Sequence, residues 1–301
     1  MYADDTTLST TLNAAHSDNE TRANDINNEL NKISIWLRVN KLSLNIKKSK
    51  YMIFYQPNKR VNEPQIKIDN IAIDCVSHFN FLGITIDKSL SWTQHIAKVQ
   101  CKISRACGIL NRMKHLLPEH IKKTLYYSLV APHLNYGLSL WGAKGKKLFK
   151  TQKRIVRTIT CSKYNAHTDP IFKALNILKI SDMHDLTKFK IYYKYVHKLL
   201  PANLLNIDIL PQTEVHEHET RNRGNLFVNR VNHVFAEQQL CASIPKLVNS
   251  APQIIKDKVF SDSLHGFSHF VKQYILKDYA ANCDIARCYI CQLNQLQIPN
   301  N

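Results

Sequence analysis

The spacing of apolar residues changes near residue 90, and this change constrains the fold of the chain more than any other feature. Before it, short alternating runs predict strands, and one stripe with steps of 4, 3 and 4 predicts a helix. After it, helical spacing continues to about residue 280. Only 7 of the 301 residues are glycine, which disfavours turn-rich all-β folds and glycine-loop nucleotide sites. We therefore predict an α+β protein that is predominantly α.

The first part of the chain is predicted to mix one helix with short strands. The expected elements are a helix over residues 26–40 and strands over residues 51–55 and 81–87. Asp69-Asn70, between two pairs of isoleucines, predicts a two-residue hairpin turn. Ser91 with Gln94 three residues later predicts a capping box, which satisfies free N–H groups where the next helix begins.

The second part is predicted to be helical. The expected helices cover residues 91–118, 121–132, 145–160 and 182–200, and a last helical region covers residues 230–280. Pro132 is expected to end or kink the second of these helices. The predicted domains are residues 1–87, a basic helical domain over 88–200, a linker or long loop over 201–229, and a helical extension over 230–301.

The net charge of +18 is distributed unevenly along the chain. Residues 1–30 carry a net charge of −5, whereas residues 91–160 hold 14 Lys and Arg against one acid, Glu119, for a net charge of +13. Such a concentration of positive charge predicts a polyanionic partner, with nucleic acid before a membrane surface. No lipid-directed feature accompanies the basic residues, so we expect no membrane partner.

A cationic stripe is expected on the helix over residues 145–160. Six basic residues contribute to it: Lys146, Lys147, Lys150, Lys153, Arg154 and Arg157. Four of them follow one another at steps of 4, 3 and 4, which places them on one helix face. A stripe of this kind can follow phosphates without reading the base sequence. The alternative interpretation is an ordinary solvated helix face.

The compartment follows from features that are absent from the sequence. No run of about 18 apolar residues occurs, so no transmembrane helix is predicted. The first five residues are acidic where a signal peptide needs a basic region. The 8 scattered cysteines are therefore expected to be reduced thiols. We predict an intracellular protein, nuclear or cytoplasmic, that is not secreted.

Two adjacent carboxylates, Asp4 and Asp5, follow Tyr2-Ala3 near the start of the chain. Hard oxygen ligands of this kind bind Mg²⁺, which takes few protein ligands and accepts substrate phosphates. As residue types alone, such a pair is more often a solvated turn or a helix cap. The sequence context of the pair distinguishes these interpretations.

Several motifs follow the acidic pair in a fixed order. They are Tyr-Ala-Asp-Asp at 2–5, Leu-Ser-Leu-Asn-Ile-Lys-Lys-Ser-Lys at 42–50, Phe-Leu-Gly-Ile-Thr-Ile-Asp at 81–87, Tyr-Ser-Leu-Val-Ala-Pro-His-Leu-Asn-Tyr-Gly at 127–137, Gln-Lys-Arg at 152–154 and Thr-Arg-Asn-Arg at 220–223. This order resembles the reverse transcriptases, or RNA-directed DNA polymerases, of non-LTR, LINE-type retrotransposons, particularly the jockey and CR1 groups. The resemblance extends over roughly residues 1–225, and it is weak beyond them.

The resemblance implies roles for individual residues. Asp4 and Asp5 correspond to metal ligands of the polymerase palm, for Mg²⁺ or Mn²⁺. Lys48 corresponds to a basic residue that contacts or protonates the leaving pyrophosphate, although a solvated lysine is the alternative. The segment over residues 81–87 corresponds to the primer grip, where Gly83 lets a nucleic-acid backbone approach closely. A simple core strand is the alternative for this segment.

The resemblance also implies a function and its limit. Residues 1–87 correspond to a partial palm and residues 88–200 to a thumb, which binds an RNA template with an RNA–DNA or DNA duplex. Family members place another essential aspartate on an earlier palm strand, upstream of the motif at which this sequence starts. We therefore expect nucleotidyl transfer by two metals in the intact family but no activity from this chain alone. The alternative is a non-enzymatic RNA- or DNA-binding protein.

A zinc site near the end of the chain stays open at this point. Cys283, Cys288 and Cys291 supply three thiols, whereas a closed zinc site needs four ligands. His216 and His218 are candidates for the fourth ligand, although the segment that contains them more often forms a polar loop.

Overall fold

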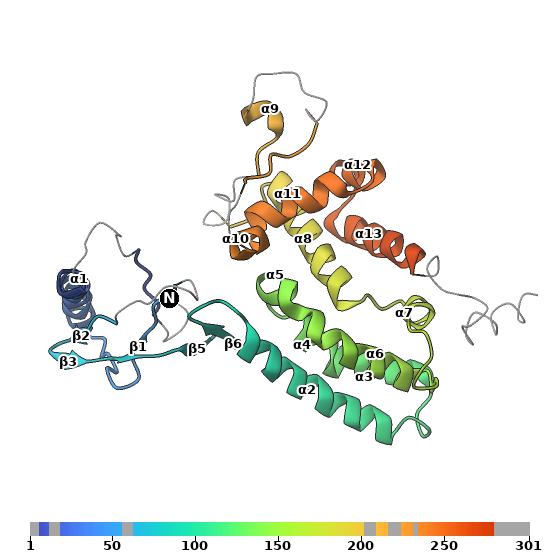
Figure 1. Cartoon of the computed structure of the whole chain (residues 1–301), viewed down its shortest axis with the longest axis horizontal. Coiled ribbons are helices and arrows are strands. Elements are labelled where there is room, and N and C mark those ends of the chain that lie inside the picture. The colour runs from blue at the N-terminus through green and yellow to red at the C-terminus, as the bar shows by residue number, and fades with distance from the viewer. Residues whose placement is uncertain are drawn as a thin grey trace, which may run out of the picture. The chain divides into compact units, whose positions relative to one another are not determined.

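The computed structural model describes residues 6–11, 19–55, 63–201, 209–215, 224–230 and 234–279. The chain divides into two compact units, Met1–His95 and Ile96–Asn301, which are described separately below (Figure 1). Helices make up most of the described residues, and the strands are short. The predicted class, α+β and predominantly α, is therefore confirmed at this level.

Within its described residues, the first unit contains one long helix and three separate two-stranded ladders. Its elements are α1 (Asn19–Val39), β1 (Lys50–Tyr51), β2 (Lys67–Ile68), β3 (Ile71–Ala72), β4 (Asp74–Cys75), β5 (His78–Phe81) and β6 (Ile84–Asp87). Strands β1 and β4 are parallel, whereas β2–β3 and β5–β6 are antiparallel hairpins. The predicted helix is confirmed, but the strand expected over residues 51–55 is reduced to β1.

Both hairpins close through two residues with left-handed backbone conformations. Asp69 and Asn70 have φ values of 49° and 63°, as a type I′ turn requires, so the predicted hairpin is confirmed. Leu82 and Gly83 have φ values of 45° and 81°. The prediction of one strand over residues 81–87 is therefore wrong, because this turn divides it into β5 and β6. Apolar alternation alone does not mark a turn, and glycine adopts positive φ without steric cost.

The helix α2 (Thr93–Arg112) begins at a corner that one carboxylate organises. Asp87 accepts hydrogen bonds from the backbone N–H groups of Ser89, Ser91 and Trp92 and from the two serine hydroxyls, at 2.8 to 3.2 Å. The Ser91 hydroxyl contacts the N–H of Thr93 at 3.4 Å. The hydrogen bonds at this corner thus converge on Asp87, where the sequence predicts a capping box.

The regular elements described in the second unit are helices, apart from an isolated β-bridge between Pro211 and Leu226. After α2 it comprises α3 (Glu119–Leu129), α4 (Ala131–Asn135), α5 (Leu138–Trp141), the 3₁₀ helix η1 (Gly142–Leu148), α6 (Phe149–Ile159), α7 (Asp169–Ala174), α8 (Ile180–Val196), α9 (Gln212–Val215), α10 (Val234–Gln238), α11 (Leu240–Ser250), α12 (Gln253–Ser261) and α13 (Leu264–Asp278). Trp141, Tyr126 and Phe172 are the largest fully buried side chains. Figure 1 shows α8 beside α11 and α13, which it contacts.

The helix predicted over residues 145–160 is interrupted. Its first part is the 3₁₀ helix η1, and only α6 is an α-helix. The 3₁₀ helix η1 packs closely against α8: a Cβ atom on Gly142 would lie 2.5 Å from the His184 ring, and one on Gly145 would lie 3.2 Å from Ile180. Two glycines therefore let η1 approach α8 where larger residues would collide.

The other predicted helices are present with small changes. Pro132 lies in the first turn of α4, which follows α3, so the expected helix break is confirmed. The helix expected over residues 182–200 is α8, and the predicted last helical region contains the four described helices α10 to α13. Within the described residues, no helix combines the length and apolarity that crossing a bilayer requires. The predicted domain boundaries stay predictions.

Candidate nucleic-acid interface

The cationic residues of α6 lie opposite its buried face. Ile155, Val156 and Ile159 are fully buried, whereas Lys150 and Arg154 are exposed. At 3.6 residues per turn, the two exposed residues lie on the side of the helix away from the three apolar ones. The predicted cationic face is thus present on α6, and its binding of nucleic acid stays a prediction.

A buried glutamine fixes the orientation of α6. The Gln152 side chain donates to the Tyr126 hydroxyl at 3.1 Å and to the carbonyl oxygen of Leu178 at 2.9 Å, and it accepts from the N–H of Ile180 at 3.0 Å. Burial raises the pKa of Tyr126 well above its usual value, so the hydroxyl stays protonated. Because this network satisfies Gln152 only in one rotation of the helix, it holds Lys150 and Arg154 toward solvent.

Two of the six predicted basic residues on this helix have partners within the protein. The Lys153 ammonium lies 4.5 Å from the centre of the Phe149 ring, in a cation–π contact. The Arg157 guanidinium donates twice to the carbonyl oxygen of Ala166. Desolvation lowers the pKa of Arg157 from its ordinary value. Arg157 therefore holds the turn that contains Ala166, and its predicted contact with nucleic acid stays a prediction.

Lys146 and Lys147 precede α6 on the 3₁₀ helix and are both exposed. Lys146 lines a cavity of about 190 Å³ that it shares with Ser181, His184 and Asp185 of α8. The expected step of four residues from Lys146 to Lys150 assumed one continuous α-helix. The tighter 3₁₀ winding changes that relation, and it places Lys146 beside α8.

A second row of exposed cations lies on α2, and sequence reasoning did not single it out. It consists of Lys98, Lys102, Arg105 and Arg112, at steps of 4, 3 and 7. Gln100 of the same helix donates to the Thr151 hydroxyl on α6. Lys98 and Lys102 are two residues away from Gln100, so the row faces away from α6. The two cationic rows thus lie on different faces, although their helical spacing was readable from the sequence.

Lys48 and Gly83 belong to the first unit. Lys48 is exposed and lies in the turn after α1, where its N–H donates to the carbonyl oxygen of Asn45 at 3.1 Å. Gly83 occupies the β5–β6 turn. The positive φ of Gly83 explains why glycine occurs at this turn position. Its predicted contact with a nucleic-acid backbone stays a prediction.

The predicted metal ligands lie outside the described residues. These are Asp4 and Asp5, the candidate zinc ligands Cys283, Cys288 and Cys291, and the histidines His216 and His218. Among the residues that the structure describes, no group of three or more His, Cys, Asp or Glu side chains could hold a metal ion.

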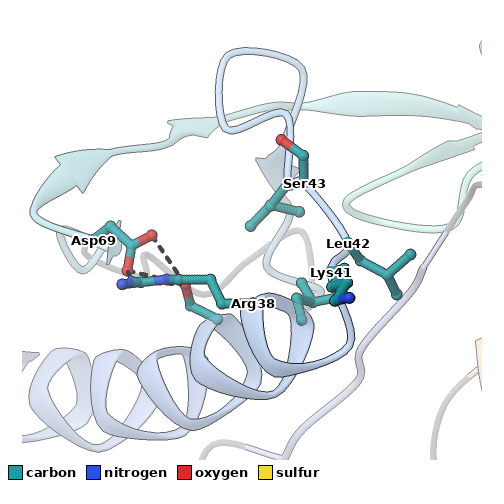
Figure 2. A pocket seen from close by; sticks show the side chains of 8 residues that line it. Arg38, Lys41, Leu42, Ser43 and Asp69 are labelled. Atoms are coloured by element: carbon teal, nitrogen blue, oxygen red, sulfur yellow. Dashed lines mark hydrogen bonds and ion pairs between the residues drawn. The ribbon is translucent and has the colours of Figure 1, made fainter.

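A pocket of about 420 Å³ lies at the end of α1 in the first unit (Figure 2). Figure 2 shows Arg38 reaching from α1 toward Asp69, with Lys41, Leu42 and Ser43 along the rest of the wall. No pocket was predicted at these residues from the sequence. Asp69 stands in the β2–β3 turn, so the pocket is bounded by that hairpin and by the helix end.

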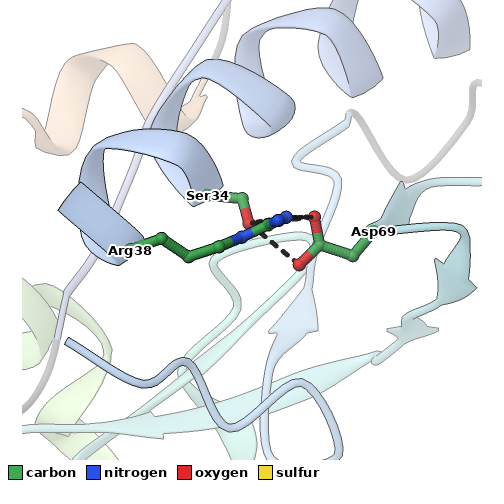
Figure 3. A network of polar contacts seen from close by, with 3 residues as sticks. All are labelled: Ser34, Arg38 and Asp69. Carbon is green, nitrogen blue, oxygen red and sulfur yellow. Dashed lines mark hydrogen bonds and ion pairs between the residues drawn. The ribbon is translucent and has the colours of Figure 1, made fainter. Parts of the chain in front are cut away.

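A polar network closes one side of this pocket (Figure 3). The Ser34 hydroxyl lies 2.9 Å from both carboxylate oxygens of Asp69, and the Arg38 guanidinium donates to the same carboxylate at 2.5 Å. Ser34 is buried, whereas Arg38 is mostly exposed. The contacts tie the hairpin to α1, and they occupy the carboxylate of Asp69 within the protein.

Comparisons with known proteins identify a class. No family model matches the chain, and no solved structure matches it significantly. Three curated proteins are similar in sequence, and all are RNA-directed DNA polymerases of mobile elements. The chain is therefore similar to this class of polymerase.

The three similar proteins come from particular mobile elements of one organism. The RNA-directed DNA polymerase from mobile element jockey of Drosophila melanogaster is 26% identical over 76% of this chain. The probable RNA-directed DNA polymerases from transposon BS and transposon X-element of the same organism are 25% and 22% identical, over 68% and 50% of the chain. The resemblance to non-LTR retrotransposon polymerases that the motifs predict is thereby confirmed. The chain spans between 17% and 26% of the length of these relatives.

Proposed function

We propose that the chain is a nucleic-acid-binding part of an RNA-directed DNA polymerase of a mobile element. The observation that carries this proposal is the exposed cationic face of α6, with Lys150 and Arg154 held outward by the buried Gln152 network. Glu119 is the only acid in residues 91–160, so little negative charge opposes an approaching phosphate backbone. The similarity to polymerases makes an RNA template with an RNA–DNA or DNA duplex the proposed partner.

The finer assignment rests on the motifs. Residues 1–87 act as a partial palm and residues 88–200 as a thumb. Asp4 and Asp5 hold Mg²⁺ or Mn²⁺, because paired carboxylates supply the hard oxygen ligands that these ions prefer. The metal supplies charge stabilisation for phosphoryl transfer when it is bound. Lys48 serves the leaving pyrophosphate, and Gly83 lies next to the nucleic-acid backbone in the whole polymerase.

The binding proposal is tested by the salt dependence of affinity for an RNA–DNA duplex. Each phosphate contact contributes a slope of about 0.9 in log K against log salt. We expect the double variant Lys150→Met, Arg154→Met to lose about 2 from this slope, equally for different duplex sequences. The matched control is Lys246→Met, which removes an exposed lysine from α11 and should leave the slope unchanged. Equal slopes for the double variant and the wild type would contradict the proposed interface.

The activity of the isolated 301 residues is a separate question. Two-metal transfer needs carboxylates on both ions, and the family places a further aspartate upstream of the pair that Asp4 and Asp5 match. We expect a polypeptide of residues 1–301 to bind a primer–template without extending the primer. The non-enzymatic alternative makes the same prediction for binding. Primer extension by this polypeptide would show that Asp4 and Asp5 suffice for polymerase activity.

A further inference from the structure

An exposed tyrosine and an exposed leucine stand on two neighbouring turns of the helical unit. Tyr164 is 90% exposed and follows α6, while Leu116 is 79% exposed and follows α2. These are the most exposed large hydrophobic side chains among the described residues. We call the two turns, residues 112–117 and 161–167, the tip. Both side chains are therefore accessible to a partner of the tip.

A buried lysine joins the two turns of the tip. The Lys122 ammonium donates to the carbonyl oxygen of Lys114 at 3.0 Å and to the Cys161 sulfur at 3.2 Å. The Cys161 thiol donates in turn to the same carbonyl oxygen at 3.3 Å. Lys122 is only 3% exposed, so these contacts bring the ends of α2 and α6 together in a fixed arrangement.

The turn that carries Tyr164 is anchored independently. The N–H of Ala166 donates to the carbonyl oxygen of Lys163 at 3.0 Å, which places Tyr164 at the corner of a β-turn. The Arg157 guanidinium stabilises the same turn through its two hydrogen bonds to the Ala166 carbonyl oxygen. The ring is thus presented on a rigid support, which reduces the entropy lost when a partner binds.

The residues around the Tyr164 ring carry positive charge, which favours a partner with negative charge. The exposed residues of the tip include the basic residues Arg112 and Lys163 and the histidines His115 and His167. The sequence contains no Asp or Glu between Glu119 and Asp169. Glu119 and Asp169 flank the two turns, and the Asp169 carboxylate is paired with the Lys179 ammonium at 2.9 Å. An exposed aromatic ring among these cations complements a chain that carries phosphates and flat bases.

We propose that the tip binds an unpaired segment of RNA or DNA, with one base stacked on the Tyr164 ring. This inference rests on the proposed nucleic-acid-binding function and adds a second contact, away from the α6 face. Inside a duplex each base is covered on both faces by its neighbours, so a ring on a protruding turn finds a free face only at the two terminal base pairs. An unpaired base offers that face, and its phosphates meet the basic residues of the tip.

The experiment compares two probes with the full chain. One is a blunt RNA–DNA duplex of about 20 base pairs, and the other is the same duplex with a single-stranded extension of about 10 nucleotides that contains 2-aminopurine. We expect Tyr164→Ala to weaken binding of the extended probe about 5- to 100-fold, the range for one lost stacked base, and to abolish fluorescence quenching. Binding of the blunt duplex should change less than about 2-fold.

Two further variants separate stacking from other effects. Tyr164→Phe keeps a ring and should retain quenching, whereas Phe260→Ala removes a ring that is 69% exposed on α12 and should change neither probe. Equal binding of the extended probe by Tyr164→Ala and the wild type would overturn the inference while leaving the α6 interface intact. Failure of the wild type to bind either probe would overturn the proposed function and this inference together.

Discussion

The guanidinium of Arg157 donates two hydrogen bonds, of 2.9 and 2.7 Å, to the carbonyl oxygen of Ala166. This contact joins the last turn of α6 to the turn that presents Tyr164. A residue that lies in the cationic stripe by sequence spacing therefore has a structural partner nine positions further along the chain. Substitution of Arg157 should therefore affect stability and binding differently from substitution of Lys150 or Arg154, which are exposed.

Replacing Arg157 should weaken nucleic-acid binding by the tip more than duplex binding by the α6 face. Arg157→Met removes two hydrogen bonds from a charged donor, and we expect a loss of about 1–2 kcal/mol in the free energy of unfolding. Arg157→Lys keeps the charge but cannot donate the same pair of bonds. Both variants should therefore weaken binding of a probe with a single-stranded extension more than binding of a blunt duplex.

The matched control for Arg157 is Lys150→Met. Lys150 is exposed on the α6 face, and both probes contain the duplex that this face is proposed to bind. The substitution should therefore weaken binding of both probes by the same factor. Urea unfolding and titration of the two probes measure the effects. If Arg157→Lys kept the wild-type ratio of the affinities for the two probes, Arg157 would act through its charge and not through the geometry of the turn.

Asp87→Asn should destabilise the corner before α2. Asn keeps one acceptor oxygen but introduces an NH₂ group next to three N–H donors, so we expect a loss of about 2–3 kcal/mol. Amide hydrogen exchange should quicken at Ser91 and Trp92, whose N–H groups lose a charged acceptor. Unchanged exchange at these two residues would contradict the central role of Asp87.

The same carboxylate should make the stability of this corner depend on pH. Burial by itself would raise the pKa of Asp87, but hydrogen bonds from Ser91, Ser89 and Trp92 outweigh it and lower the pKa. A carboxyl with a lowered folded-state pKa stabilises fully above its unfolded pKa of about 3.9, and the contribution is lost as pH falls through the folded-state value. The stability difference between wild type and Asp87→Asn should therefore shrink below about pH 4.

Gly142→Ala should introduce a collision between η1 and α8. The new methyl group would lie 2.5 Å from Cδ2 of His184, so the His184 ring or the η1 backbone would have to move. We expect a loss of about 1–3 kcal/mol, measured by thermal or urea unfolding. In a His184→Ala background the same substitution should cost much less, because the colliding ring is absent. Equal losses in the two backgrounds would show that the contact does not limit the packing.

His184 should also make the helical unit less stable in mild acid. Burial, with a smaller effect from the Lys188 ammonium, lowers the pKa of His184 to about 4. The unfolded chain therefore binds a proton near pH 6.5 that the folded chain does not. Stability from this source is complete above about pH 6.5 and falls as pH decreases toward 4. The comparison is with His184→Gln, which should lack this part of the pH dependence in unfolding experiments.

Local patterns were sufficient for much of the fold. The stripe from Ile26 to Leu37 predicted α1, Asp69-Asn70 predicted a hairpin, and Pro132 marked a helix break. Each depends on neighbours within a few positions, which the sequence displays directly. The division of residues 81–87 by the Leu82–Gly83 turn was missed, because alternating apolar residues are compatible with one strand or with a hairpin.

The sequence by itself determined the predominantly helical class, the concentration of positive charge in residues 91–160 and the resemblance to retrotransposon polymerases. Only the tertiary structure decided which cations face solvent. Lys150 and Arg154 do so because Gln152 is bound on the opposite side of α6, whereas Arg157 turns to Ala166 and Lys146 lies beside α8. Helical spacing gives the angle of a side chain about its own helix, but its partners depend on segments that are distant in the sequence.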